Sequence, residues 1–442
     1  MTKDKDNPGG NGAEVKLGSQ PQGKVPIFDL KKNTMLIALV ALMLVFHILI
    51  VVNGKGSFFA ATNITNLIGQ NSYVVILAVG MLLCILTGGN IDLSVGSGVC
   101  MLSALAGTLI VTMEMNIYLA IVITLAAGIG MGALQGYFIA YVRIPAFIVT
   151  LAGMLTFRGI GYIILGGMTL APFPQEYIKI FNGFLPSGAE KDTQMAVTII
   201  VAIAISLFFV ITQLVTRARK QMKGYPVASL PATILKLAII VAVIILAFYL
   251  FGQNKGIPVV LFTLAIVVIV YHYYTSKTVS GRHLYAMGGN EKATIFSGIN
   301  TNKVMFFAYT NMGFLVAVAS LVCIARFNSA APSAGNGYEL DAIGACFIGG
   351  ASAYGGTGTV GGAAIGAIFM GVLNNGMSIL GIDANWQKAV KGVVLLIAVL
   401  ADVTSQKNRK GHVKTVLGIP VSDIILSVLL FIKRIVDRRN QN

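Results

Sequence analysis

Charged residues are scarce in this chain. They make up 11% of its 442 residues, whereas 56% of the residues are hydrophobic; an ordinary soluble domain is about 25% charged. The apolar residues form many runs of about 20 residues, which is the length that an α-helix needs to cross a bilayer. The short alternating strands of a membrane β-barrel are absent. The composition therefore excludes a soluble globular domain and predicts an all-α polytopic membrane protein.

Cysteine and the usual catalytic motifs are also rare or missing. The four cysteines lie in apolar runs without a C-x-x-C pair, and the four histidines are scattered. These patterns indicate neither disulfides nor a metal site. The phosphate-binding motif G-x-x-x-x-G-K-[ST] and the spacing of zinc proteases do not occur. We therefore expect no metal, no cofactor bound by this chain and no catalytic residues, so the chain is not expected to be an enzyme.

Acidic residues number only half as many as basic residues, 16 against 32, and the net charge is +16. A strong positive charge can indicate nucleic-acid binding. Here, however, the lysines and arginines gather in short loops between apolar runs, as the positive bias of cytoplasmic loops predicts. The charge therefore indicates orientation in a membrane, and no nucleic-acid partner is expected.

The same charges test a count of membrane spans. Basic residues gather at Arg143 and in the stretches 31–32, 217–223, 277–303 and 407–410. All five places fall on the cytoplasmic side if the chain starts inside and alternates, which predicts about 12 transmembrane helices with both termini cytoplasmic. The expected spans are 34–52, 64–86, 93–113, 117–140, 146–167, 195–216, 232–251, 257–275, 304–325, 339–354, 360–380 and 387–403.

These spans define a transmembrane domain at 34–403. Its polar segment 277–303 is expected in the cytosol, where soluble proteins can reach it. Its longest outside loop, at 168–194, contains three prolines and offers a surface to extracytoplasmic partners. The segment 339–354 is short for a span, so it either crosses the membrane or forms a half-helix or re-entrant element lined by protein or water.

The two ends of the chain differ from this domain. Residues 1–33 lack the apolar core of a signal peptide and are predicted to be a disordered cytosolic tail. Residues 404–442 are predicted to form a basic cytosolic tail. Within it, 415–432 is apolar but flanked by basic groups on both sides, which favours a helix lying in the membrane interface over a further span.

The first glycine-rich stretch is 86–98, with the sequence LTGGNIDLSVGSG. Gly88 and Gly89 interrupt the helical periodicity, and Asp92 is a carboxylate close to a membrane span, where charge is costly. One interpretation is that Asp92 caps the third span by accepting from the amides near Ser94 and Val95. The other is that Asp92 contacts a transported substrate.

The second glycine-rich stretch is 347–362. Its segment 356–361 formally matches the dinucleotide fingerprint G-x-G-x-x-G, but that motif requires a βαβ setting, and membrane spans flank it here. Gly362 and Gly366 fit a small-xxx-small helix contact. The glycines of this stretch either allow close packing or permit bends beside a translocation path. The residues singled out are Gly349, Gly350, Ser352, Gly355, Gly356, Gly358 and Gly361.

The cytosolic stretch 281–303 contains the turn Gly288-Gly289-Asn290-Glu291. Asn290 is a plausible N-cap for a short helix, and Glu291 would lie in the first turn, where the helix dipole favours an acid. Such a capped helix on a cytosolic loop predicts a docking element. The basic residues of the stretch either contribute to docking or simply orient the chain, and orientation is favoured for Lys292 and Lys303.

These three stretches resemble the signature motifs of permease subunits of ribose/xylose/galactose-type monosaccharide ABC importers. The similarity covers most of 62–402. It implies that the cytosolic stretch is the coupling element that sits in a groove of a separate ATPase subunit. The coupling residues carried over by the resemblance are Gly281, Arg282, Gly288, Gly289, Asn290, Glu291 and Gly298.

The chain departs from the broader permease pattern E-A-A-x-x-x-G at two positions, because Lys292 replaces the first alanine and Gly298 comes one residue late. These departures concern the specificity for the ATPase partner. The spans at 232–251 and 257–275 look like an insertion relative to shorter ribose-type permeases, which suits the multiple-monosaccharide or xylose branch.

The resemblance implies a bacterial cytoplasmic-membrane permease, in a homodimer, that moves a monosaccharide inward. ATP and Mg²⁺ would bind the ATPase, and an extracytoplasmic binding protein would deliver the sugar. Asn374 and Asn375 are the candidates for the substrate path. Related permeases for nucleosides, autoinducer or branched-chain amino acids are alternatives. An ion-coupled transporter is disfavoured because Asp92 is almost alone near the membrane core, and an intramembrane enzyme lacks paired catalytic groups.

Overall fold

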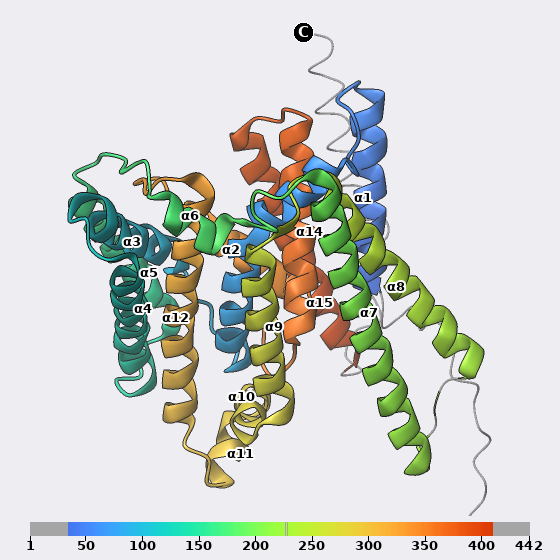
Figure 1. Ribbon diagram of the computed structural model, residues 1–442. Helices are drawn as coiled ribbons and strands as arrows, with labels where there is room; N and C mark the ends of the chain where they lie inside the picture. The colour runs from blue at the N-terminus through green and yellow to red at the C-terminus, as the bar shows by residue number, and fades with distance from the viewer. Residues whose placement is uncertain (1–33, 226, 228, 410–442) are drawn as a thin grey trace, which may run out of the picture.

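The computed structural model describes residues 34–225, 227 and 229–409, and these form a helical protein with one very small β-sheet (Figure 1). The predicted tail 1–33 and the predicted interfacial helix 415–432 lie outside the described residues. The helices are α1 Thr34–Val52, α2 Ala61–Leu86, α3 Val95–Gly107 with the π-helical turn η1 Thr108–Thr112, α4 Ile117–Ala140, α5 Ala146–Leu165, α6 Gln175–Asn182, α7 Lys191–Met222, α8 Leu230–Gln253, α9 Val260–Lys277, α10 Val279–Gly289, α11 Glu291–Phe296, α12 Thr301–Phe327, α13 Tyr338–Ile348, α14 Val360–Ile379 and α15 Ala384–Arg409.

The two central helices are α2 and α12. In their apolar stretches 83% and 72% of the residues are buried, compared with 17% in α7 and in α8. Small residues allow this close packing: a side chain at Gly313 of α12 would overlap the backbone of Gly128 and Gly132 on α4. Helices in lipid associate through such small-residue contacts, because lipid offers no hydrophobic gain for larger side chains.

Ten of the described helices are long and apolar enough to cross a membrane, rather than the predicted number of about 12. Two predicted spans are not among these ten, 339–354 and 387–403. The first is replaced by α13, whose 11 residues extend for about 16 Å, half of a hydrocarbon core of about 30 Å. This length fits the half-helix alternative. The second lies within the 26-residue helix α15, which is long enough to cross.

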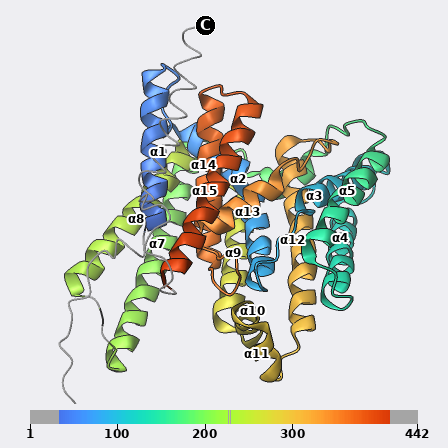
Figure 2. The same cartoon turned by 180° about the vertical axis from the view of Figure 1, so that it is seen from behind.

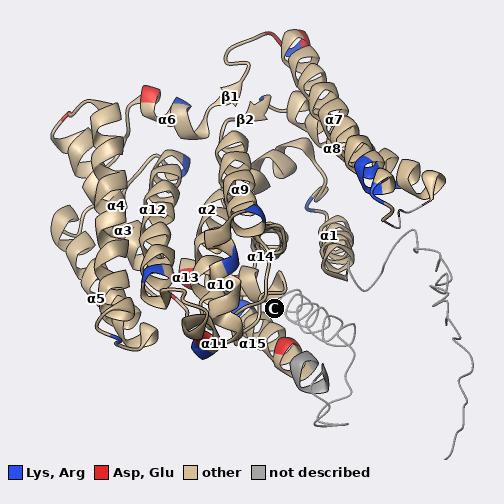
Figure 3. Cartoon of the chain, turned by 90° about the horizontal axis from the view of Figure 1, so that it is seen from below, with Lys and Arg blue, Asp and Glu red and all other residues tan. Residues whose placement is uncertain are grey.

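The two ends of the helix assembly differ. Helices α10 and α11 lie at one end, and α6 lies toward the other (Figures 1 and 2). The outside loop predicted at 168–194 contains α6 and strand β1 (Phe184–Leu185), which pairs antiparallel with β2 (Ile257–Pro258). Seen from the α10–α11 end, the hairpin of α7 and α8 stands to one side of the assembly, and basic residues gather toward the end of α7 (Figure 3).

Candidate functional site

The segment predicted to dock an ATPase forms two short helices, α10 and α11. Asn290, between them, has extended backbone, and its Oδ1 accepts from the amide of Ala293 at 3.0 Å. The predicted N-cap is therefore confirmed, and Glu291 occupies the first turn of α11 as expected. Gly298 follows with a φ of +79°, a left-handed conformation that glycine adopts at little cost and that ends the short helix.

The end of α11 presents apolar side chains outward. Phe296 is 90% exposed and Ile295 is 49% exposed, while Thr294 faces the protein and is buried. Burial of one such aromatic side chain in a partner contributes about 1.5–3 kcal/mol. An aromatic side chain held at the tip of a capped helix can therefore anchor a partner protein.

Arg143, in the loop between α4 and α5, ties this segment to the membrane helices. Its Nη1 lies 2.9 Å from Oε1 of Glu291. Its Nη2 donates to Oγ1 of Thr301 at 3.5 Å and to Oδ1 of Asn302. Arg143 was assigned from the sequence to charge orientation alone, and nothing local could reveal its partner, since 148 residues separate it from Glu291.

The three signature stretches meet at one backbone junction, which the sequence analysis did not predict. The amide of Gly356 donates to the carbonyl oxygen of Leu86 at 3.2 Å. A side chain at Gly288 would overlap both of these groups. The end of α2, helix α10 and the loop 349–359 are therefore in backbone contact, because at these positions glycine provides no Cβ to separate them.

A second contact extends this junction. Gly89 and Gly355 have φ values of +78° and +83°. A side chain at Gly89 would overlap the carbonyl of Ala353, and one at Gly355 would overlap Gly88. Each glycine is therefore required both by its backbone conformation and by the proximity of another chain segment. The two glycine-rich stretches thus form one unit, which we call the glycine junction (Leu86–Gly89, Gly288–Gly289 and Ala353–Gly356).

Two side chains hold the loop 349–359 in place. The hydroxyl of Tyr285 on α10 donates to the carbonyl of Gly358 at 3.0 Å, and burial raises the pKa of Tyr285, which keeps its proton available for this bond. On the other side, Oδ2 of Asp402 on α15 accepts from the amide of Ala353 at 3.0 Å. Helices α10 and α15 are therefore both hydrogen-bonded to this loop.

The other glycines in and just after the second stretch differ in whether another backbone segment lies against them. Side chains at Gly349, Gly362 and Gly366 would overlap backbone of the facing helix, which agrees with the predicted small-xxx-small contact between α13 and α14. Gly350 and Gly361, in contrast, face open space. Two further members shape the loop: Oγ of Ser352 accepts from the amide of Tyr354, and Gly358 has a φ of +144°.

Asp92 has local partners in the protein. Its Oδ1 accepts from the amide of Ser94 at 2.8 Å and from the hydroxyl of Ser94 at 2.6 Å. Gln135 on α4 donates to Oγ of Ser94 at 2.8 Å. Asp92 therefore accepts from the amide of Ser94, as the capping interpretation expected, but the N-cap residue of α3 is Ser94, whose side chain makes no capping bond. This network joins the start of α3 to α4 and occupies the carboxylate with protein donors.

The two asparagines proposed for the substrate path have different surroundings. Asn375 is buried and donates from Nδ2 to Oδ1 of Asn63 at 3.0 Å and to Oε1 of Gln70 at 3.1 Å, which joins α14 to α2. Asn374 interacts with Asp341, whose carboxylate accepts from Nζ of Lys391 at 3.0 Å. Among the described residues, Oδ1 of both asparagines is buried without a hydrogen bond.

The ion pair of Asp341 and Lys391 was missed from the sequence. Asp341 lies in the first turn of α13, and its side chain is 2% exposed. The available signal was a lysine inside one predicted span and an aspartate inside another, since ionisable groups within a membrane usually pair with each other.

Comparisons with known proteins agree with this geometry. Residues 63–399 match the family described as branched-chain amino acid transport system / permease component. The chain is 38% identical to the xylose transport system permease protein XylH of Haemophilus influenzae, over 87% of this chain and 99% of that protein. It is 36% identical to XylH of Escherichia coli, over 90% and 98%. It is also 34% identical to the Escherichia coli ribose import permease protein RbsC, over 85% and 95%. No solved structure matches the chain.

Proposed function

Since the chain belongs to this family of permease components of bacterial ABC importers, we propose that it moves a pentose inward across the cytoplasmic membrane. The chain is a multi-pass membrane subunit and not itself an enzyme. The observation that carries the mechanism is the glycine junction, because it places the coupling helix α10 in backbone contact with the end of central helix α2. A partner that moves α10 therefore moves the transmembrane core.

The partners follow from this role. A separate ATPase binds ATP and Mg²⁺ and receives the α10–α11 segment in a groove, with Phe296 as the apolar anchor. A soluble binding protein delivers the substrate to the opposite face. A ligand or partner shifts a conformational equilibrium only through contacts that differ between the states. The Arg143–Glu291 pair and the glycine junction are two of the contacts that α10 and α11 make with the rest of the protein. Two copies of the permease form the complete pathway.

In this proposal the chain crosses the membrane 12 times, and both termini are cytoplasmic. Ten crossings are the long apolar helices. The eleventh is α13 with the loop 349–359, because Tyr338 stacks on Tyr73 within the helix layer while Gly356 reaches the coupling helix. The twelfth is α15, which begins near the outer end of α14 and brings Asp402 to the same loop.

A pentose is favoured as substrate because the chain aligns with two xylose permeases over 99% and 98% of their length. The orphaned oxygens of Asn374 and Asn375 are the proposed acceptors for sugar hydroxyls on the path. The second candidate function is transport of branched-chain amino acids, which the description of the family names.

The test uses proteoliposomes that contain the permease and its ATPase, loaded with ATP and Mg²⁺, with the binding protein outside. We expect uptake of labelled xylose or ribose that survives collapse of the proton and sodium gradients. Uptake of leucine without either pentose would favour the second candidate. Pentose transport by the permease alone, driven by an imposed ion gradient, would contradict the importer mechanism.

A further inference from the structure

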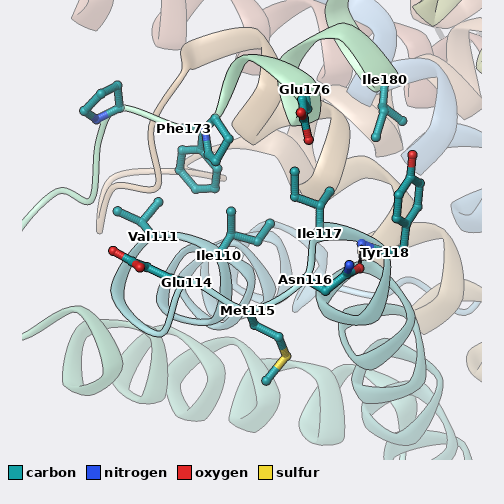
Figure 4. Close-up of a pocket in the computed structure, with 12 residues that line it drawn as sticks. Ile110, Val111, Glu114, Met115, Asn116, Ile117, Tyr118, Phe173, Glu176 and Ile180 are labelled. Atoms are coloured by element: carbon teal, nitrogen blue, oxygen red, sulfur yellow. Dashed lines mark hydrogen bonds between the residues drawn. The ribbon is translucent and has the colours of Figure 1, made fainter.

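A hollow of about 670 Å³ lies between the η1–α4 turn and the segment around α6 (Figure 4). It falls in the size range of about 300–1,000 Å³ typical of ligand pockets. Helix α6, which lines the hollow, lies at the end of the molecule opposite α10 and α11 (Figure 1). In the proposed orientation the hollow therefore opens on the extracytoplasmic face, where a binding protein must dock.

The hollow combines apolar walls with two acids. Ile110 and Phe173 are buried beneath it, and half-buried Ile117 and Ile180 form part of its sides. Glu114 and Glu176 are exposed at its edge, and Figure 4 shows both carboxylates beside the hollow. Among the described residues neither carboxylate has an ion pair or hydrogen bond, and no lysine or arginine lines the hollow. The lining therefore carries two carboxylates and no basic residue, although Lys179 lies one turn from Glu176 on α6.

Hydrogen bonds fix the α6 segment, which forms one side of the hollow. The hydroxyl of Tyr177 donates to the carbonyl of Leu321 at 2.7 Å, and Oδ1 of Asn328 accepts from the amide of Phe173 at 2.9 Å. Leu170 and Ala330 exchange two backbone hydrogen bonds of 2.9 Å. All of these contacts attach the α6 segment to the outer part of α12 or the residues just after it. Helix α12 begins next to the coupling segment, where Arg143 contacts Thr301.

We propose that this hollow receives a lysine or arginine side chain from the binding protein. The inference rests on the proposed function. A long basic side chain matches the site because its apolar stem can lie on the isoleucines and Phe173 while its charge meets Glu114 and Glu176. Complementary charges of this kind steer association and fix the register of two proteins. A sugar is a poorer match, because the walls are apolar and the only amide side chain, Asn116, already caps α4.

The experiment measures the uptake rate in the proteoliposomes as a function of binding-protein concentration, at low and high ionic strength. We expect the double variant E114Q/E176Q to raise the half-saturating concentration at low ionic strength by about three- to tenfold, as loss of two rim charge contacts predicts. The maximal rate should stay unchanged. The salt dependence seen with the unaltered permease should weaken, because rim charges act mainly on association.

The matched control is E190Q, which removes an exposed carboxylate near the start of α7 that does not line the hollow. It should leave both quantities unchanged. Equal half-saturation and equal salt dependence in E114Q/E176Q and the unaltered permease would overturn the inference. So would direct binding of the sugar to the permease, without binding protein, that E176Q abolishes. If the unaltered permease takes up no sugar with ATP and binding protein, the proposed function itself fails.

Binding-protein variants identify the basic residue. Each exposed lysine or arginine of the binding protein is replaced by alanine and combined with E176Q in a double-mutant cycle. The effect of one basic residue of the binding protein on the half-saturating concentration should be non-additive with that of E176Q and additive with that of E190Q. Additive effects for every basic residue would contradict a direct contact.

Discussion

Gly356 shows how a single residue can control the glycine junction. Its φ is +67°, and a Cβ there would lie 2.7 Å from the amide nitrogen of Gly289 and 2.8 Å from the carbonyl carbon of Gly288. The left-handed backbone alone costs an alanine about 1–2 kcal/mol, and the overlap adds to this cost. Gly361, five residues later, faces open space at the start of α14.

We therefore expect G356A to lose most transport and to lower the thermal stability of the purified permease. G361A should match or slightly exceed the unaltered protein, because alanine favours a helix over glycine by about 1 kcal/mol. Uptake assays and thermal unfolding of both variants check this pair. If G356A and G361A show equal transport and equal thermal stability, the close backbone contact at Gly356 is not required for either property.

The pair of Arg143 and Glu291 is also testable at the residue scale. Both side chains are nearly half exposed, at 47% and 41%, so the pair should contribute only about 0.2–1 kcal/mol to stability. Its expected role is to hold α11 in register with the α4–α5 loop. R143E and E291R should each leave the permease folded but reduce the sugar transported per ATP hydrolysed. The exchange variant R143E/E291R should recover much of that ratio, and failure of the exchange to improve on either single variant would contradict the pairing.

At the scale of elements, α11 is the proposed anchor for the ATPase. F296A removes the aromatic side chain that is 90% exposed. Because burial of such a side chain contributes about 1.5–3 kcal/mol, the ATPase should bind about 10- to 100-fold more weakly. Binding of the purified ATPase to detergent-solubilised permease measures this change. K292A, an exposed change on the same helix, is the control and should bind within a factor of a few; equal affinities for F296A and the unaltered permease would exclude Phe296 as the anchor.

Helices α13 and α15 are joined by Asp341 and Lys391, which are 2% and 18% exposed. K391M leaves a buried carboxylate without its partner, which should destabilise the permease by about 3–5 kcal/mol. D341N/K391M removes both charges and should be considerably more stable than K391M alone. Thermal unfolding in detergent compares the variants. If the double variant is as unstable as K391M, packing rather than charge pairing governs this contact.

At the scale of the whole molecule, the proposed topology places the α6 end and the α10–α11 end on opposite sides of the membrane. Ser187 and Ser297 are exposed at these two ends. In a background without the four natural cysteines, S187C should react with an impermeant reagent in intact cells, and S297C only in inside-out vesicles. Labelling of both positions from the same side would contradict the orientation.

The sequence by itself determined the helical membrane class, the limits of most spans and the cap at Asn290. These properties depend on composition, period and residues close together in the chain, so they can be derived from local physics. The predicted span 387–403 lies within the 26-residue helix α15, whereas 339–354 corresponds to the 11-residue helix α13, which is too short to cross.

Only the tertiary structure decided which of these parts meet. The pairs Arg143–Glu291 and Asp341–Lys391, and the contact between Gly288 and Gly356, join positions that lie far apart in the chain. The sequence marks Asp341, Lys391 and Gly288 as unusual, because a charge in lipid or a glycine in a helix carries a cost. Which group offsets that cost depends on how the helices pack, and packing is a property of the whole folded chain.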